Sequence, residues 1–232
     1  MESMRIAVGQ PLVGTDLTAS VSAHAALVLA ARADVMVFPE MSLTGYRLDA
    51  DPVNLDRLNE LVLACRAVVT CALVGAPIVH NGQRAIAVLR VDSDGVSVAY
   101  RKSFLAEDEK AHFEAGPGAT AIEIDGWRFG LGVCKDTGVD EHIDATAALD
   151  VDVYACGVVH HRSELAEQRR RATDIASRCD AYVAMASFAG PTGGGYDRTA
   201  GTSLIVSPYG ETLAQASELA GDYTAVTIHQ SL

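Results

Sequence analysis

Three reactive side chains each follow a short apolar segment of the type that forms a β-strand. Glu40 comes after residues 34–38, Lys102 after residues 96–100 and Cys134 after residues 129–133. Ligands in α/β sheets usually bind beyond the ends of strands, so these side chains could meet at one site. Singly, the first two are more often solvated turn residues and the cysteine a small core residue. Together they offer a thiol nucleophile, a carboxylate base and an ammonium group.

The chemistry open to such a group is the cleavage of an acyl bond. An ordinary thiol, with a pKa of ~8.5, is only about 3% thiolate at neutral pH, so Cys134 needs a neighbouring base or cation. Glu40 can take the thiol proton and return it to a departing amine. Lys102 and the backbone N–H of Lys135 can donate to the oxyanion of a tetrahedral intermediate. Water activated by Glu40 would then hydrolyse the acyl thioester, and no metal or organic cofactor is required.

The elements that must position these groups can be predicted from hydrophobic periodicity. Amphipathic patterns predict helices over residues 17–31, 54–69, 141–149 and 163–179. Turn signals at Asn81-Gly82 and Asp94-Gly95 predict an antiparallel meander. Strands are expected at 5–8, 34–38, 73–79, 85–91, 96–100, 121–124, 129–133, 151–155, 182–187, 203–207, 212–216 and 223–228. Because strands, hairpins and helices are interleaved, we expect a layered α/β architecture with mixed sheets.

Three long irregular stretches, 41–52, 103–117 and 188–202, are expected to be binding or catalytic loops. The glycines at 193–195 lack the residues of a phosphate-binding motif, so we interpret their segment as a flexible loop. His160 and His161 are adjacent, and adjacent strand residues point to opposite faces, which argues against a metal pair. Asp136 is expected to anchor the turn at Cys134 through hydrogen bonds.

Length, composition and charge limit the classes of protein that remain. The 232 residues, 49% hydrophobic and 21% charged, predict one domain over residues 1–232. A balance of 18 basic against 30 acidic residues argues against a nucleic-acid partner. No apolar run approaches the ~18 residues of a membrane span, and the N-terminal sequence is unlike a secretory signal. Five cysteines without a close CxxC pair favour a reducing, cytoplasmic location.

Three sequence blocks resemble motifs of a known family, the nitrilase superfamily of carbon–nitrogen hydrolases. Residues 37–46 (VFPEMSLTGY) look like its glutamate motif, residues 100–102 (YRK) its lysine motif and residues 132–136 (GVCKD) its cysteine motif. Their order and the gaps between them also agree with the family. The resemblance extends over nearly the whole chain.

This resemblance implies a fold and a set of roles. The fold would be a four-layer α-β-β-α sandwich with mixed sheets, usually paired with a second copy, so a homodimer is expected. Glu40 would be the general base, Lys102 the oxyanion-stabilising lysine and Cys134 the nucleophile. Glu109 looks like the second glutamate that positions substrate in many members, with Glu107 and Glu114 as rivals for that role.

The chain departs from the family pattern just after the nucleophile. Lys135 stands where many members have an aromatic or neutral polar residue, and it could position an anionic substrate or simply be solvated. Thr137-Gly138 stands where relatives that bind a substrate carboxylate often have an arginine. We therefore expect a hydrolase of small aliphatic amides. Nitrile or N-carbamoyl hydrolysis with the same triad, acyl transfer to an amine, and a non-catalytic binding role on this scaffold remain open as alternatives.

Overall fold

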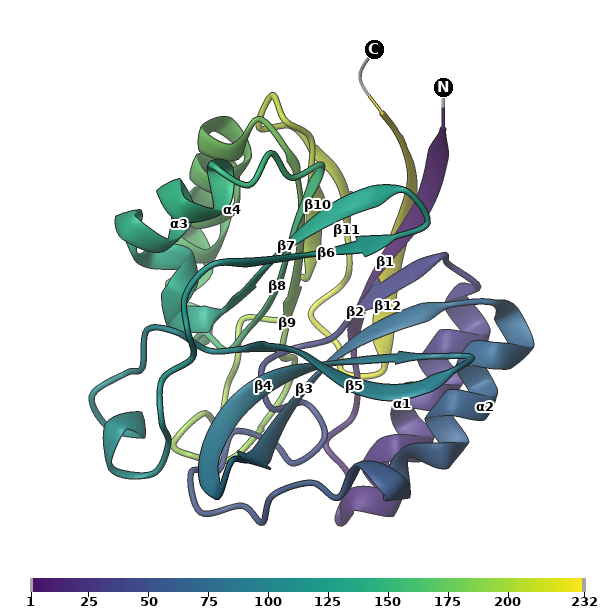
Figure 1. The fold of residues 1–232 in the computed structure, drawn as a ribbon, viewed down its shortest axis with the longest axis vertical. Coiled ribbons are helices and arrows are strands. Elements are labelled where there is room, and N and C mark those ends of the chain that lie inside the picture. The colour runs from purple at the N-terminus through teal and green to yellow at the C-terminus, as the bar shows by residue number, and fades with distance from the viewer. Residues whose placement is uncertain (1, 231–232) are drawn as a thin grey trace.

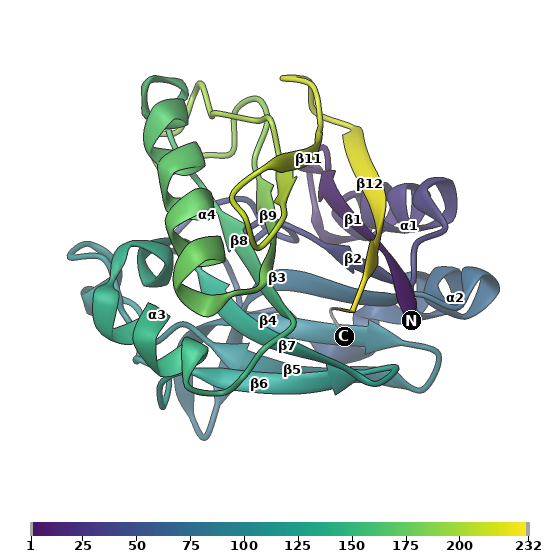
Figure 2. The same cartoon turned by 90° about the horizontal axis from the view of Figure 1, so that it is seen from above.

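The computed structural model describes residues 2–230. It has four layers in the order helix, sheet, sheet and helix (Figures 1 and 2). Two six-stranded sheets stack face to face, with strand orders β12-β1-β2-β3-β4-β5 and β11-β10-β9-β8-β7-β6. Helices α1 and α2 pack on the outer face of the first sheet, and α3 and α4 on that of the second. The expected α-β-β-α sandwich is thus confirmed.

The first sheet combines parallel and antiparallel pairing. Strands β1 and β2 and strands β2 and β3 pair in parallel, and β12 adds antiparallel to the other edge of β1. The turns at 81–82 and 94–95 join β3, β4 and β5 into the expected antiparallel meander. The bounds are β1 Ser3–Gln10, α1 Leu17–Ala31, β2 Val35–Val37, α2 Asn59–Val68, β3 Cys71–His80, β4 Gln83–Asp92, β5 Gly95–Arg101 and β12 Asp222–His229.

The second sheet is built on the same plan. Strands β7, β8 and β9 are parallel, while β6 and β10 pair antiparallel to β7 and β9, and β11 extends the sheet beyond β10. The bounds are β6 Thr120–Ile124, β7 Trp127–Val133, α3 Asp140–Ala147, β8 Val153–Val158, α4 Leu165–Cys179, β9 Tyr182–Ser187, β10 Leu204–Val206 and β11 Thr212–Gln215.

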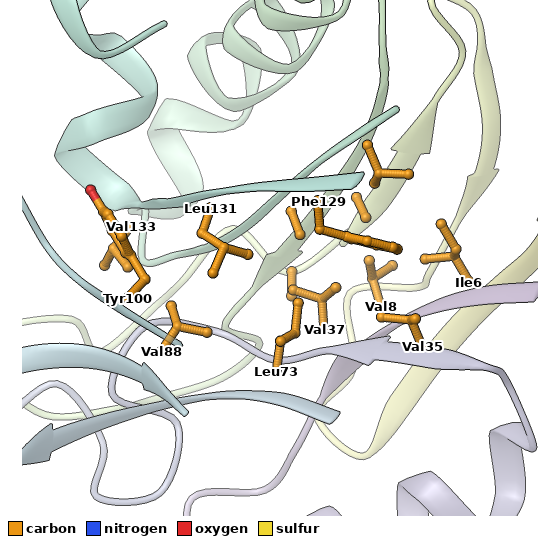
Figure 3. Packing of buried hydrophobic residues seen from close by; sticks show 14 of the residues in the cluster. Ile6, Val8, Val35, Val37, Leu73, Val88, Tyr100, Phe129, Leu131 and Val133 are labelled. Atoms are coloured by element: carbon orange, nitrogen blue, oxygen red, sulfur yellow. The ribbon is translucent and has the colours of Figure 1, made fainter. Parts of the chain in front are cut away.

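The main core lies between the two sheets, and strand alternation explains its composition. Val37 and Leu73 of the first sheet face Phe129 and Leu131 of the second, as Figure 3 shows. Residues one position away, such as Ala72, face the helices instead, because successive strand side chains point to opposite faces. Burying one such large apolar side chain stabilises the fold by roughly 1.5–3 kcal/mol.

Helix boundaries follow from local capping. The Asp16 side chain accepts a hydrogen bond from Ala19 N (2.9 Å) at the start of α1, and the helix ends at Arg32 in the left-handed conformation. The helix expected over 54–69 begins instead as a 3₁₀ turn, η1 (Leu55–Leu58), capped by Asn54, before α2 starts. Between residues 2 and 230, no helix is long and apolar enough to cross a membrane.

Candidate active site

The three predicted catalytic residues lie just beyond the ends of β2, β5 and β7, and the structure brings them together. Lys102 Nζ donates to Glu40 Oε1 over 2.7 Å. The Cys134 thiol lies close enough to both for their charges to change its pKa. Glu40 and Lys102 are almost fully buried, whereas Cys134 keeps part of its surface open to solvent. The expectation that strand ends would assemble these side chains agrees with this geometry.

One glycine from each sheet packs closely against the loop that carries Glu40. A Cβ on Gly75 of β3 would lie 2.2 Å from Pro39 O, and one on Gly157 of β8 would lie 2.5 Å from Phe38 O. Both distances are far below van der Waals contact, so only glycine fits at either position. The backbone before Glu40 is therefore wedged between the two sheets.

A single ammonium group holds two buried carboxylates. Lys102 Nζ also donates to Glu109 Oε1 (2.6 Å), and the same oxygen accepts the Tyr46 hydroxyl (2.8 Å). Glu109 Oε2 accepts the backbone N–H of Ala106 (2.7 Å). Glu109 thus has both oxygens occupied, whereas Glu40 Oε2 is buried with no hydrogen-bond partner among residues 2–230. An unpaired carboxylate oxygen is costly to bury, and it is free to receive a proton.

The electrostatics of this cluster favour a thiol beside a carboxylate base. Burial raises the pKa of Glu40 above its ordinary value, with Lys102 opposing and Glu109 reinforcing the shift. For Lys102, burial alone would lower the pKa, but the negative charges around it raise it more, so the ammonium form persists. Burial, then the charge of Glu40, raises the pKa of Cys134 to about 12. The raised pKa therefore favours the neutral thiol form of Cys134.

Cys134, the predicted nucleophile, lies at the start of a short 3₁₀ turn, η3 (Cys134–Gly138). Cys134 has a positive φ of 43°, a strained conformation for a residue with a side chain. Its thiol donates to Val159 O (3.4 Å), beyond the end of β8. Asp136 anchors the turn as expected, because its carboxylate accepts the backbone N–H groups of Val133 (2.9 Å) and Phe104 (2.8 Å).

A buried polar chain extends from Asp136 toward helix α3. Asp136 accepts the Tyr100 hydroxyl (2.9 Å), which lies 2.9 Å from His142 Nε2, while His142 Nδ1 lies 3.1 Å from the Tyr154 hydroxyl. Since Tyr100 gives its one proton to Asp136, His142 Nε2 must donate to Tyr100 and Nδ1 must accept from Tyr154. Burial lowers the pKa of His142, in keeping with this neutral tautomer.

Of the three candidate positioning glutamates, the structure places only Glu109 in the cluster. It begins the 3₁₀ turn η2 (Glu109–Ala111), which turns its side chain inward. Glu107 is exposed and pairs with Lys110 (2.6 Å), and Glu114 is also exposed. The exposed Lys135 donates to Leu105 O (2.7 Å) and lines an outer groove of about 470 Å³ with residues 103–105, 110 and 113–115. None of Glu40, Lys102, Glu109 and Cys134 lines that groove.

Two aromatic residues near the clustered carboxylates were missed by sequence reasoning. Tyr46 belongs to the glutamate motif, but its bond to Glu109 depends on a loop 63 positions away. Tyr196 lies in the glycine-rich loop, where nothing in the local sequence indicates which way a side chain points. Over residues 2–230, no group of three or more histidine, cysteine or acidic side chains is arranged to hold a metal ion.

Comparisons with known sequences place this geometry in a family. The sequence profile of the carbon–nitrogen hydrolase family matches residues 5–232. An (R)-stereoselective amidase of Pseudomonas sp. is 28% identical over 199 residues, which cover 79% of this chain and 69% of that protein. The Omega-amidase YafV of Yersinia enterocolitica is 29% identical over 215 residues, or 89% of this chain and 82% of that protein.

Solved structures agree on the fold. A CN-hydrolase superfamily protein from Xanthomonas campestris superimposes with a TM-score of 0.88 at 18% identity, covering 99% of this chain and 91% of its own. A double mutant of the amidase from Nesterenkonia sp. AN1, solved in complex with acrylamide, gives a TM-score of 0.86 at 21% identity, with coverages of 97% and 90%. The resemblance to the nitrilase superfamily is confirmed. Since the family profile spans nearly the whole chain, this protein belongs to the carbon–nitrogen hydrolase family and is an enzyme that hydrolyses carbon–nitrogen bonds.

Proposed function

We propose that the enzyme hydrolyses small aliphatic amides through an acyl thioester on Cys134, with Glu40 as general base and Lys102 as oxyanion donor. The observation that carries the proposal is the asymmetry of the two carboxylates on Lys102. Both oxygens of Glu109 accept hydrogen bonds, while Oε2 of Glu40, a close neighbour of Cys134, is buried with no hydrogen-bond partner in the described part of the chain. A free, partly desolvated carboxylate is suited to proton transfer, and a saturated one to holding the lysine.

The reaction follows from these positions. Glu40 takes the thiol proton as sulfur attacks the amide carbon, and Lys102 donates to the developing oxyanion, with the N–H of Lys135 as second donor. Glu40 returns its proton to the amide nitrogen, ammonia leaves and the thioester remains. Water then gives a proton to Glu40 and attacks the thioester, and the thiol is regenerated as the acid departs. Glu109 keeps Lys102 in place by accepting a hydrogen bond from its ammonium group (2.6 Å).

The relatives support an amide rather than another substrate. Two of the similar proteins bear the names amidase and omega-amidase, and a similar structure is an amidase holding acrylamide. The ammonium group of Lys135 donates to Leu105 O and lies in the outer groove. Lys135 can therefore position only a substrate that is long enough to reach that groove.

The test is ammonia release by wild type, Cys134→Ala and Glu40→Gln from short amides, ω-amido acids, nitriles and N-carbamoyl amino acids. We expect release from short amides that both substitutions abolish, with each variant still folded by circular dichroism. Cys179→Ala, which changes a buried cysteine on α4, is the matched control and should remain active. Release from nitriles or N-carbamoyl compounds alone would replace the amide assignment. Full activity of Cys134→Ala would refute the mechanism.

Assembly and location stay predictions from the sequence. We propose a homodimer in the cytoplasm, formed by a single domain over residues 1–232. All five cysteines are free, and four of them are buried, which is compatible with a reducing compartment. Light scattering coupled to size-exclusion chromatography would show a mass near twice 24.4 kDa if the dimer forms.

A further inference from the structure

The glycine-rich loop between β9 and β10 is docked onto the loop that carries Glu40. Tyr46 N donates to Thr192 Oγ1 (3.1 Å), and a Cβ on Gly194 would lie 2.2 Å from Tyr46 O, so the two backbones touch. The far end of the same loop forms a bridge between Thr199 and His161, next to the end of β8. The loop therefore spans from the Glu40 side of the site to the Cys134 side.

Tyr196 occupies the middle of this span and is held on two sides. Its ring stacks on His161, with centroids 4.3 Å apart and an interplanar angle of 14°. Tyr46 meets it edge-on at 5.2 Å and 83°. Both geometries are favourable for aromatic pairs and fix the plane of the ring. Two backbone bonds, from Thr192 N to Tyr196 O and from Tyr196 N to Gly193 O (both 3.0 Å), fix its backbone as well.

The fixed ring lies beside the reacting groups. Tyr196 and Cys134 are both half-buried and pack against the same core between the sheets. Burial raises the pKa of the Tyr196 phenol, and the proximity of Cys134 and Glu40 raises it further. The ring thus lies between Tyr46, which bonds Glu109, and His161, two residues beyond the Val159 carbonyl that accepts the Cys134 thiol.

We propose that Tyr196, clamped between His161 and Tyr46, is a specificity-determining residue that limits the length of the acyl chain admitted to Cys134. This inference rests on the proposed amide hydrolysis. In a primary amide the leaving group is ammonia, so the acyl chain is the only part with bulk. Tyr46 cannot move aside for a longer acyl chain, because its hydroxyl donates a hydrogen bond to Glu109. Tyr196 is the wall that sets the limit.

The first experiment measures kcat/KM for linear amides of increasing chain length. Wild type should lose activity sharply beyond a short optimum, since one excess methylene against a rigid wall changes discrimination about tenfold or more. Tyr196→Ala should move the optimum to longer chains and raise the long-to-short ratio at least about tenfold. Tyr196→Phe keeps the ring and should keep the wild-type profile. Tyr209→Ala, at an exposed tyrosine, is the matched control. An unchanged optimum in Tyr196→Ala overturns the inference.

A second experiment decides the point without hydrolysis. The rates at which iodoacetamide and the bulkier N-benzyl iodoacetamide alkylate Cys134 are followed by peptide mass spectrometry. Tyr196→Ala should raise the bulky-to-small rate ratio at least about tenfold, and His161→Ala, which removes the stacking partner, should raise it less. If no amide is hydrolysed but this ratio rises, the proposed amide hydrolysis is wrong, and the role of Tyr196 in limiting access to Cys134 is supported. An unchanged rate ratio in Tyr196→Ala refutes this role of Tyr196.

Discussion

Buried His24 should make the stability of the enzyme strongly dependent on pH. Its ring is fully enclosed, with Nδ1 2.7 Å from Ser20 O and Nε2 2.8 Å from Ser42 Oγ. A carbonyl oxygen only accepts, so Nδ1 carries the proton and Nε2 accepts from the Ser42 hydroxyl. A second proton on the ring would turn Nε2 into a donor, so the Ser42 hydroxyl could no longer donate to it, and the charge would be buried. Burial accordingly lowers the pKa of His24 from 6.5 to about 4.

The size and sign of the effect follow from linkage. Below pH 6.5 the unfolded chain takes up a proton at His24, while the folded protein does not until about pH 4. The stability contributed by the neutral ring is therefore complete above about pH 6.5 and is lost as the pH falls toward 4. At ~1.4 kcal/mol per pH unit, this interval corresponds to about 3 kcal/mol of unfolding free energy.

The measurement is the free energy of urea unfolding at several pH values for wild type, His24→Gln and Ser42→Ala. Between about pH 7 and 4, wild type should lose about 3 kcal/mol more than His24→Gln, whose amide does not titrate. Other buried histidines contribute equally to both proteins and cancel in the difference. Ser42→Ala is the control, since it keeps the imidazole and should keep a steep dependence. The reasoning is refuted if His24→Gln loses stability with the wild-type slope.

Four further predictions test the site. Lys102→Met should lower kcat about 10²–10³-fold, measured on the best amide, because one oxyanion donor is lost; a smaller loss would move that role to the backbone. The profile of kcat/KM should rise with pH through the raised pKa of Glu40, and a limb at the ordinary glutamate value would contradict its burial. Gly157→Ala should cost about 1–3 kcal/mol in thermal or urea unfolding and reduce kcat, through contact with Phe38 O. Asp136→Asn should cost a similar amount, because its amide N–H₂ would face a donor; unchanged stability would show that the Asp136 bonds are dispensable.

Periodicity predicted the elements well where the signal is local. The bounds 17–31 for α1 and 182–187 for β9 agree residue for residue with the structure, because strong apolar patterns end at turn residues. The strand expected at 151–155 begins later and runs on to Val158. Asp150 has a positive φ and the Asp152 side chain accepts Arg128 N (2.7 Å), so the chain is still turning there. Such side-chain hydrogen bonds do not change the hydrophobic pattern of the sequence, so periodicity cannot predict where this strand begins.

The site was predictable to the extent that it depends on strand ends. Glu40, Lys102 and Cys134 each follow a recognisable strand, and their motifs supply the order. The choice of Glu109 over its neighbours needed the η2 turn, which is only three residues long. Tyr196 needed the docking of a loop onto residues about 150 positions earlier, and no sequence pattern encodes that contact.

The wedged position of the Glu40 loop has a consequence for how the enzyme acquires activity as it folds. Lys102 follows a strand of the first sheet and Cys134 a strand of the second, while the backbone before Glu40 packs against Gly75 of the first and Gly157 of the second. Neither sheet alone can therefore bring Glu40, Lys102 and Cys134 together. In refolding, recovery of turnover should therefore trail the return of secondary structure and coincide with docking of the two halves. The rate at which turnover recovers therefore measures the last step in the folding of this protein.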